Sequence, residues 1–111
     1  MKYLLVLLLS TMIFHGTGAE HDNALIIDVR TLKEFNDGHL ASAQHIPLQN
    51  IAKQSTTLLP DKGQKIYVYC RSGVRSGKAR NILRQLGYSD VINAGGLNVA
   101  GKLLSDEIIV N

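Results

Sequence analysis

The chain has a single cysteine, no tryptophan and only two prolines among its 111 residues. One cysteine cannot form a disulfide within the chain, so a scaffold held together by internal disulfides is excluded. Aromatic residues make up only 5% of the sequence, and the core must therefore be built from Leu, Ile, Val and Ala. Hydrophobic residues make up 45% and charged residues 19%, which is typical of a globular chain and not of a disordered one.

Basic runs interleaved with aromatic residues are also missing, which argues against a nucleic-acid-binding surface. The sequence has 12 basic and 9 acidic residues; without Lys2 the balance is 11 to 9, a net charge of +2. An uninterrupted run of about 20 apolar residues, the length needed to cross a bilayer, is absent as well. We therefore expect neither nucleic acid nor membrane as a partner of the mature chain.

The first 19 residues have the pattern of a secretory signal peptide. Lys2 supplies a positive start, residues 3–14 are mostly apolar, and a small-residue exit ends at Ala19. The pattern predicts cleavage after Ala19, a mature domain over residues 20–111 and a periplasmic location. A membrane anchor is the alternative, but Ser10 and Thr11 interrupt an apolar run that is already short.

Short apolar strands alternate with helical segments along the rest of the chain. Thr31 and Glu34 have the spacing of a capping box, and Gly38 is placed to end the helix that they begin. Alternating strands and helices predict an α/β fold around a parallel sheet. The predicted strands cover residues 24–29, 42–48, 65–70 and 90–96; the predicted helices cover residues 31–37, 49–59 and 76–86, with a short last helix after residue 96.

The only cysteine, Cys70, lies where the strongest predicted strand gives way to a helix. Ligands in open α/β sheets bind beyond the carboxyl ends of the strands. A helix start offers unpaired N–H groups and a partial positive charge, and Gly73 permits the tight backbone that lets the amides of residues 71–75 converge. Arg71 and Arg75 add positive charge, which favours a thiolate and an anionic ligand. The sequence therefore predicts a reactive thiolate beside a small-anion site.

Other interpretations of this loop are available. A lone cysteine is usually a small buried hydrophobe, and Arg75 could be an ordinary solvated side chain. A phosphate-binding P-loop is excluded because one residue too few separates Gly73 from Gly77 and because Ala79 replaces the required hydroxyl. A cysteine-dependent phosphatase loop, with the pattern C-x5-R, would need an arginine where Ser76 stands. The loop is one residue short for cradling a phosphate.

Three stretches of the chain resemble the rhodanese family, the sulfurtransferases that carry sulfur as a cysteine persulfide. Residues 26–48 contain D-V-R, E-F, G-H-L and A-x-x-I-P in that order. The short loop after Cys70 follows, and residues 86–97 resemble the closing strand and glycine pair of the family. The resemblance covers most of residues 20–111.

The resemblance implies a small rhodanese-like α/β domain with a parallel sheet of about four or five strands, flanked by helices. Only residues 20–24 precede the D-V-R strand, which favours a sheet of about four strands. It further implies a thiosulfate sulfurtransferase that needs no metal or organic cofactor. In this interpretation Cys70 is the nucleophile that takes a sulfane sulfur from a small anionic donor and passes it to cyanide or a thiol. The substrate-binding residues are Arg71, Ser72, Gly73, Val74 and Arg75, whose amides hold the outer sulfur.

Several finer expectations follow from the same resemblance. Arg30 and Glu34 are expected to form an ion pair near the start of the first helix, and His39 is expected to bond backbone in a turn. A monomer is expected. The alternative function is a non-catalytic rhodanese-like module that binds an anion or a partner, although an intact Cys70 weighs against it.

Overall fold

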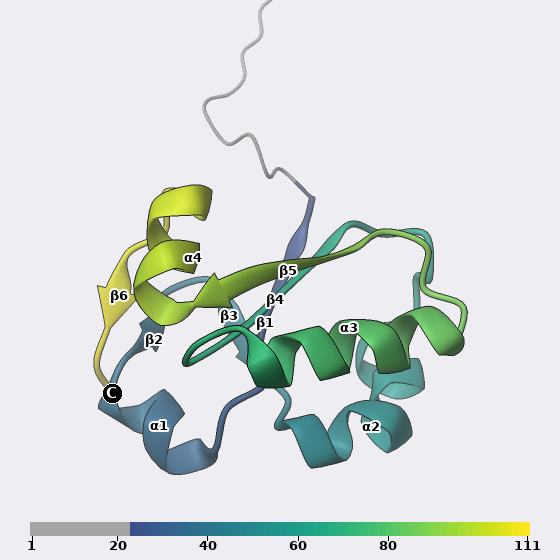
Figure 1. The fold of residues 1–111 in the computed structure, drawn as a ribbon, viewed down its shortest axis with the longest axis horizontal. Helices are drawn as coiled ribbons and strands as arrows, with labels where there is room; N and C mark the ends of the chain where they lie inside the picture. The colour runs from purple at the N-terminus through teal and green to yellow at the C-terminus, as the bar shows by residue number, and fades with distance from the viewer. Residues whose placement is uncertain (1–22) are drawn as a thin grey trace, which may run out of the picture.

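The computed structural model describes residues 23–111, and the signal peptide expected over residues 1–19 lies outside them. Four parallel strands form one sheet in the order β3-β1-β4-β5 (Figure 1). The predicted α/β fold with a parallel sheet of about four strands is confirmed. The strands are β1 (Leu25–Asp28), β3 (Ala43–His45), β4 (Ile66–Cys70) and β5 (Val91–Gly96).

Helices cover both faces of this sheet, with α2 and α3 on one face and α4 on the other (Figure 1). The helices are α1 (Leu32–Asp37), α2 (Ile51–Leu58), α3 (Val74–Gln85) and α4 (Leu97–Leu104), with a 3-10 turn, η1 (Leu48–Asn50), before α2. Among residues 23–111, none of the helices has both the length and the apolar character needed to span a bilayer.

The two faces of the sheet carry separate apolar clusters. Ile27 and Val68 belong to the cluster under α2 and α3, whereas Ile26 and Tyr69 belong to the cluster under α4. Successive residues of a strand point to opposite faces, so the two central strands, β1 and β4, need apolar residues on both faces; Asp28, buried at the end of β1, is the exception. Burial of each large aliphatic side chain contributes about 1.5–3 kcal/mol, and these contacts hold the carboxyl end of β4 in place.

The first helix begins as the sequence predicts. The Thr31 hydroxyl accepts a hydrogen bond from the Glu34 amide at 3.2 Å, and the Glu34 carboxylate accepts one from the Thr31 amide at 3.0 Å. Gly38 caps the carboxyl end with a φ of 153°. A capping interaction of this kind stabilises a helix by about 1 kcal/mol, which matters for a helix of six residues.

Two features were not predicted. The strands β2 (His39–Leu40) and β6 (Ile108–Ile109) form a separate antiparallel pair of two residues each, which is too short to leave a periodic pattern in the sequence. The helix α3 begins at Val74, two residues before the predicted start at Ser76. The earlier start leaves only residues 71–73 between the end of β4 and the helix.

Candidate active site

Cys70 is the last residue of the central strand β4, and the chain turns directly from it into α3. Its side chain is only 1% exposed, so the sulfur is screened from bulk water. The side chains of Arg71, Ser72 and Val74 are exposed. With these side chains directed outward, the loop presents its backbone to the sulfur.

The sulfur accepts two hydrogen bonds. The Gly73 amide donates to Sγ at 3.0 Å, and the Ser76 hydroxyl lies 3.3 Å from Sγ. Burial raises the pKa of the Cys70 thiol, but hydrogen bonds outweigh this effect. They come from the Ser76 side chain and from the amides of Ser76, Ser72 and Gly73, and together they lower the pKa of Cys70 to about 7. About half of the thiol is therefore ionised near neutral pH.

Two glycines make this loop geometry possible. Gly73, which caps the start of α3, has a φ of +99°, a left-handed conformation that side-chain-bearing residues rarely adopt. Gly96 lies beside Cys70 across a β-bulge, and a Cβ atom there would overlap the carbonyl oxygen of Arg71. Gly96 thus leaves room for the backbone of the cysteine loop.

Sequence reasoning missed two polar residues beneath the loop, Ser76 and Asn93. The Asn93 amide donates from Nδ2 to the Gly73 carbonyl at 2.9 Å. Its Oδ1 accepts from the Gly95 amide at 3.0 Å and lies 2.7 Å from the Ser76 hydroxyl. A signal was available: Ser76 is a polar residue on the apolar stripe of α3 that contains Ala79, and Asn93 interrupts an otherwise apolar strand.

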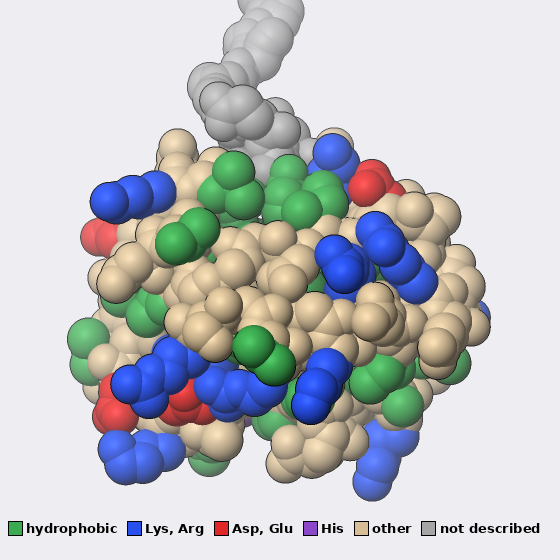
Figure 2. Space-filling model, viewed as in Figure 1, with side chains coloured by type: hydrophobic (Ala, Val, Ile, Leu, Met, Phe, Trp, Pro, Cys, Tyr) green, Lys and Arg blue, Asp and Glu red, His purple; other side chains and the backbone are tan. Residues whose placement is uncertain are grey.

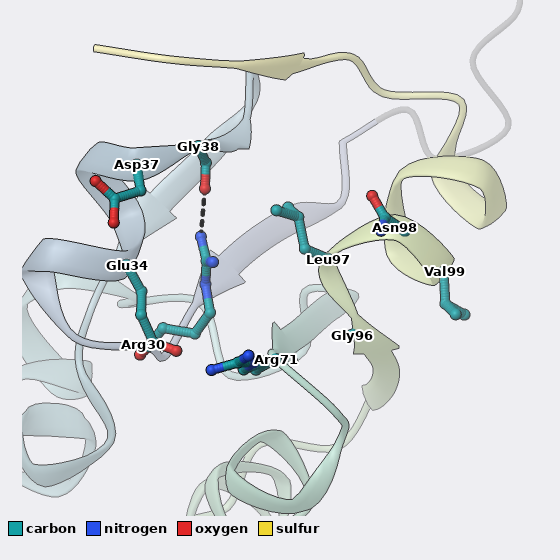
Figure 3. Close-up of a pocket in the computed structure, with 9 residues that line it drawn as sticks. All are labelled: Arg30, Glu34, Asp37, Gly38, Arg71, Gly96, Leu97, Asn98 and Val99. Atoms are coloured by element: carbon teal, nitrogen blue, oxygen red, sulfur yellow. Dashed lines mark hydrogen bonds between the residues drawn. The ribbon is translucent and has the colours of Figure 1, made fainter.

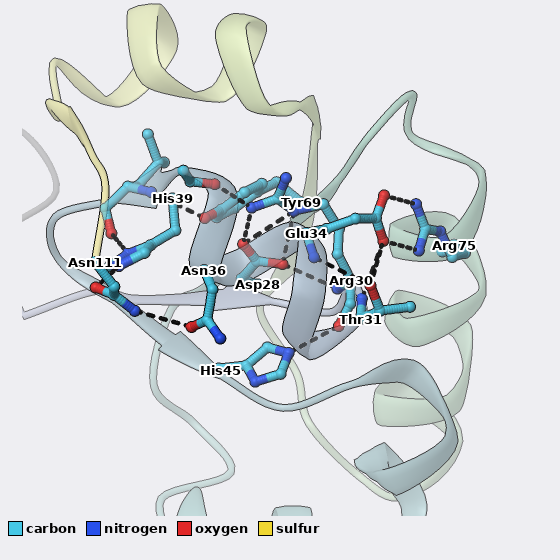
Figure 4. Close-up of polar contacts among 12 residues, drawn as sticks. Asp28, Arg30, Thr31, Glu34, Asn36, His39, His45, Tyr69, Arg75 and Asn111 are labelled. Carbon is cyan, nitrogen blue, oxygen red and sulfur yellow. Dashed lines mark hydrogen bonds and ion pairs between the residues drawn. The ribbon is translucent and has the colours of Figure 1, made fainter.

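Arg75 does not stand free beside the sulfur. Its guanidinium binds the Glu34 carboxylate through two hydrogen bonds, at 2.7 and 2.9 Å. The hydrogen bond from Arg75, together with hydrogen bonds from the Thr31 amide and hydroxyl, lowers the pKa of Glu34 to about 2. The expected ion pair between Arg30 and Glu34 is therefore wrong, because Glu34 points across to α3 instead (Figure 4).

Arg30 is paired with Asp28, at the end of β1. Asp28 is completely buried and Arg30 is 6% exposed. A buried charge without a partner is strongly destabilising, so these two side chains pair with each other. Arg30 donates to the Asp28 carboxylate at 2.6–3.1 Å and to the Gly38 carbonyl at 2.6 Å (Figure 4). His39 bonds backbone as expected, with Nδ1 2.8 Å from the Leu40 carbonyl oxygen, but it lies in the strand β2 and not in a turn.

A cavity of about 530 Å³ opens beside the loop (Figure 3). Arg71 is the loop residue that lines it, while the side chain of Cys70 is not part of its wall. Within residues 23–111 Arg71 forms no ion pair, in contrast to Arg75. Arg71 is therefore the guanidinium best placed to meet an anion. The complete lining is Arg30, Glu34, Asp37, Gly38, Arg71, Gly96, Leu97, Asn98 and Val99.

Known proteins are similar to this chain in sequence and in fold. The thiosulfate sulfurtransferase PspE of Escherichia coli strain K12 is 42% identical over 71 residues, which cover 64% of this chain and 68% of that protein. The solved structure of a rhodanese with anions from E. coli has a TM-score of 0.72 at 34% identity, and the match covers 79% of this chain and 99% of that one. A tRNA uridine(34) hydroxylase of Onion yellows phytoplasma is 38% identical over 90 residues, 75% of this chain but only 29% of that protein.

These relatives carry more than one activity by name, so their likeness identifies a family and does not identify a reaction. The family model for the rhodanese-like domain matches residues 17–99, most of the 111-residue chain. From this match, and from a fold shared with solved rhodanese structures, the chain belongs to the rhodanese-like domain family.

Proposed function

We propose that this protein is a thiosulfate sulfurtransferase that carries a sulfane sulfur as a persulfide on Cys70. The observation that carries the proposal is the buried sulfur at the end of β4, which accepts hydrogen bonds from the Gly73 amide and the Ser76 hydroxyl. These donors favour the thiolate, which is the nucleophilic form of the thiol. The name of the relative that is 42% identical, a thiosulfate sulfurtransferase, supports the same choice of donor.

In the first half-reaction the Cys70 thiolate attacks the outer sulfur of thiosulfate. A bond forms between Sγ and that sulfur, the sulfur–sulfur bond of thiosulfate breaks, and sulfite leaves with the bonding electron pair. Three negative charges enter, and three leave on the persulfide anion and sulfite. Backbone donors that are fixed in place before the reaction lower its barrier when they stabilise negative charge that develops in the transition state, as an oxyanion hole does.

In the second half-reaction cyanide or a thiolate attacks the outer sulfur of the persulfide. The new bond forms to that sulfur, the Cys70 sulfur–sulfur bond breaks, and the Cys70 thiolate is regenerated. With cyanide the product is thiocyanate, and two negative charges stand on each side. The covalent intermediate divides one difficult transfer into two easier ones.

The charge around the loop favours an anionic donor. The helix α3 carries Arg75, Lys78, Arg80 and Arg84 and no acidic residue. Figure 2 shows basic side chains spread over the face of the molecule on which α3 lies, with few acidic ones among them. Because Glu34 offsets the charge of Arg75, we assign the main attraction for thiosulfate to Arg71.

The test is a steady-state assay of thiocyanate formed from thiosulfate and cyanide. The full chain should form thiocyanate, and Cys70→Ser should not. The alternative is a module that binds an anion without turnover. It would be favoured if no thiocyanate formed, if Cys70 resisted thiol reagents, and if thiosulfate still bound. Hydrolysis of a phosphate ester is not expected, because the loop is one residue short of a phosphatase loop.

We also propose that the protein is exported and processed after Ala19. The supporting observation is the sequence pattern of residues 1–19, with its positive start, apolar stretch and small-residue exit. Expression of the full chain in a Gram-negative host, followed by osmotic shock and N-terminal sequencing, should yield a released protein that begins at Glu20. Recovery only in the cytosol with Met1 intact would refute export.

A further inference from the structure

Ser76 has one hydroxyl hydrogen and two acceptors for it. Its side chain is completely buried, so bulk water does not complete its hydrogen bonding. The hydroxyl oxygen lies 3.3 Å from Sγ of Cys70 and 2.7 Å from Oδ1 of Asn93. Because a serine hydroxyl donates a single hydrogen, the two hydrogen bonds are alternatives and cannot both be made at once.

The orientation of the Asn93 amide is set by its backbone partners. Nδ2 donates to the Gly73 carbonyl at 2.9 Å, and Oδ1 accepts from the Gly95 amide at 3.0 Å. If the amide oxygen and nitrogen were exchanged, two acceptors would face each other at Gly73 and two donors at Gly95. Oδ1 therefore stays an acceptor toward Ser76 whatever the state of the sulfur.

The charge on the sulfur decides which acceptor takes the hydrogen. A hydrogen bond to an ionised acceptor is about twice as strong as one between neutral groups, so the Cys70 thiolate attracts the Ser76 hydrogen. The Ser76 and Asn93 oxygens then face each other at 2.7 Å without a hydrogen between them. A protonated sulfur, or one bonded to a second sulfur, is a weak acceptor, and the hydrogen then returns to Asn93.

We propose that the Ser76 hydroxyl is a two-position switch. It donates to Cys70 while that sulfur is charged, and to Asn93 once that sulfur is bonded to a second sulfur. Asn93 is the positioning residue that supplies the second acceptor. The persulfide half of this cycle rests on the proposed function, whereas the thiolate half needs no sulfur donor. One consequence is that Asn93 competes with the thiolate for the hydrogen. Asn93 thus weakens the thiolate of the free protein and favours the bonded sulfur.

The other charged groups near the sulfur are left unchanged by the variants that test this switch. Arg75 acts on the sulfur from α3 and is paired with Glu34 on α1. Arg71 follows the cysteine in the loop, and Asp28 at the end of the adjacent strand β1 is paired with Arg30. A change in thiol ionisation in these variants therefore reports either on the Ser76 hydrogen or on the anchoring of the loop by Asn93, and the double-variant cycle separates the two.

The experiment is a double-variant cycle of Ser76→Ala, Asn93→Leu and their combination. The rate of alkylation of Cys70 by iodoacetamide, measured from about pH 5 to about pH 9, reports the thiolate without any sulfur donor. Ser76→Ala should slow alkylation at about pH 6 by roughly tenfold, because the thiolate loses a charge-assisted hydrogen bond. Asn93→Leu should speed it by roughly threefold, because the hydrogen is then committed to the sulfur.

The decisive comparison is the effect of Asn93→Leu in the Ser76→Ala background, where the acceleration should vanish. An effect of the same size in both backgrounds would overturn the proposal, since Asn93 would then act only by anchoring the loop. If Asn93→Leu fails to fold, Asn93→Asp replaces it. The carboxylate that Asn93→Asp introduces should slow alkylation of Cys70 at about pH 6, and the slowing should be smaller in the Ser76→Ala background. Equal slowing would again overturn the proposal.

A matched control is Ser89→Ala, which removes an exposed hydroxyl that bonds the Lys62 carbonyl and should leave alkylation unchanged. Circular dichroism establishes that each variant is folded. Because alkylation requires no sulfur transfer, failure of the switch and failure of the proposed sulfurtransferase activity are distinguishable. If the parent protein formed no thiocyanate, the proposed activity would be refuted, and the alkylation rates of the variants would still test the switch.

Discussion

Substitution of Gly96 by alanine tests the placement of the cysteine loop most selectively. Gly96 has a φ of −85° and a ψ of 173°, an extended conformation that alanine adopts without strain. The added Cβ, however, would overlap the carbonyl oxygen of Arg71 and lie 3.1 Å from its carbonyl carbon. The variant therefore perturbs contact with the loop and leaves the local backbone preference of β5 satisfied.

The size of the effect follows from what must move. The obstructing atoms are backbone, so the overlap is relieved only if the peptide between Arg71 and Ser72 shifts by roughly 1 Å. A shift of that size would break the 3.0 Å hydrogen bond from Gly73 to the sulfur. Overpacking of this kind costs about 1–3 kcal/mol of stability, and a misplacement of about 1 Å in an active site reduces the rate by roughly a hundredfold.

Three measurements on Gly96→Ala check this reasoning. Thiocyanate formation should fall by roughly a hundredfold, the midpoint of Cys70 alkylation should move to higher pH, and urea unfolding should show a loss of about 1–3 kcal/mol. Gly63→Ala is the control, because a Cβ there would make only an ordinary contact, 3.5 Å from an Asp61 oxygen. A Gly96→Ala protein with the activity and stability of the parent would refute the loop geometry.

Three further predictions concern charge. Alkylation of Cys70 should rise with pH to a plateau with a midpoint at about 7, below the value of about 8.5 for a free thiol; a midpoint near that free value would contradict the hydrogen-bonded sulfur. Arg71→Met should raise the KM for thiosulfate by roughly threefold to tenfold with little change in kcat, and the effect should shrink at high salt; an effect on kcat alone would contradict its role. Glu34→Gln should cost about 1 kcal/mol, a modest figure because its pair with Arg75 is partly exposed to solvent. The folded-state pKa of Glu34, about 2, lies below its unfolded value of about 4.3, so this contribution is present above about pH 4.3 and is lost as the pH falls to about 2. Urea unfolding of both proteins should therefore show a gap at neutral pH that closes in acid, and a gap independent of pH would rule out the ion pair as its source.

Local patterns in the sequence predicted much of this fold. The Thr31 and Glu34 capping box is a relation between residues three apart, and its hydrogen bonds form as the spacing indicates. The apolar run over residues 66–70 is continuous because β4 packs against apolar clusters on both faces. The position of Cys70, at the carboxyl end of that strand and before a helix, follows from the same run.

Contacts between distant parts of the chain were not predictable in the same way. Arg75 meets Glu34 across 41 residues, and Asn93 meets Gly73 across 20, because the fold brings α1, α3 and β5 to one end of the sheet. The partner of Arg30 could have been found. Asp28 ends an apolar strand, and a carboxylate buried there requires a nearby cation.

The proposed activity requires Sγ of Cys70 to carry the sulfur, and intact-protein mass spectrometry after incubation with thiosulfate tests this most directly. We expect a mass gain of one sulfur atom per chain, located on Cys70, removed by cyanide and absent in Cys70→Ser. A protein that gains no sulfur, or that gains it equally in Cys70→Ser, would contradict it.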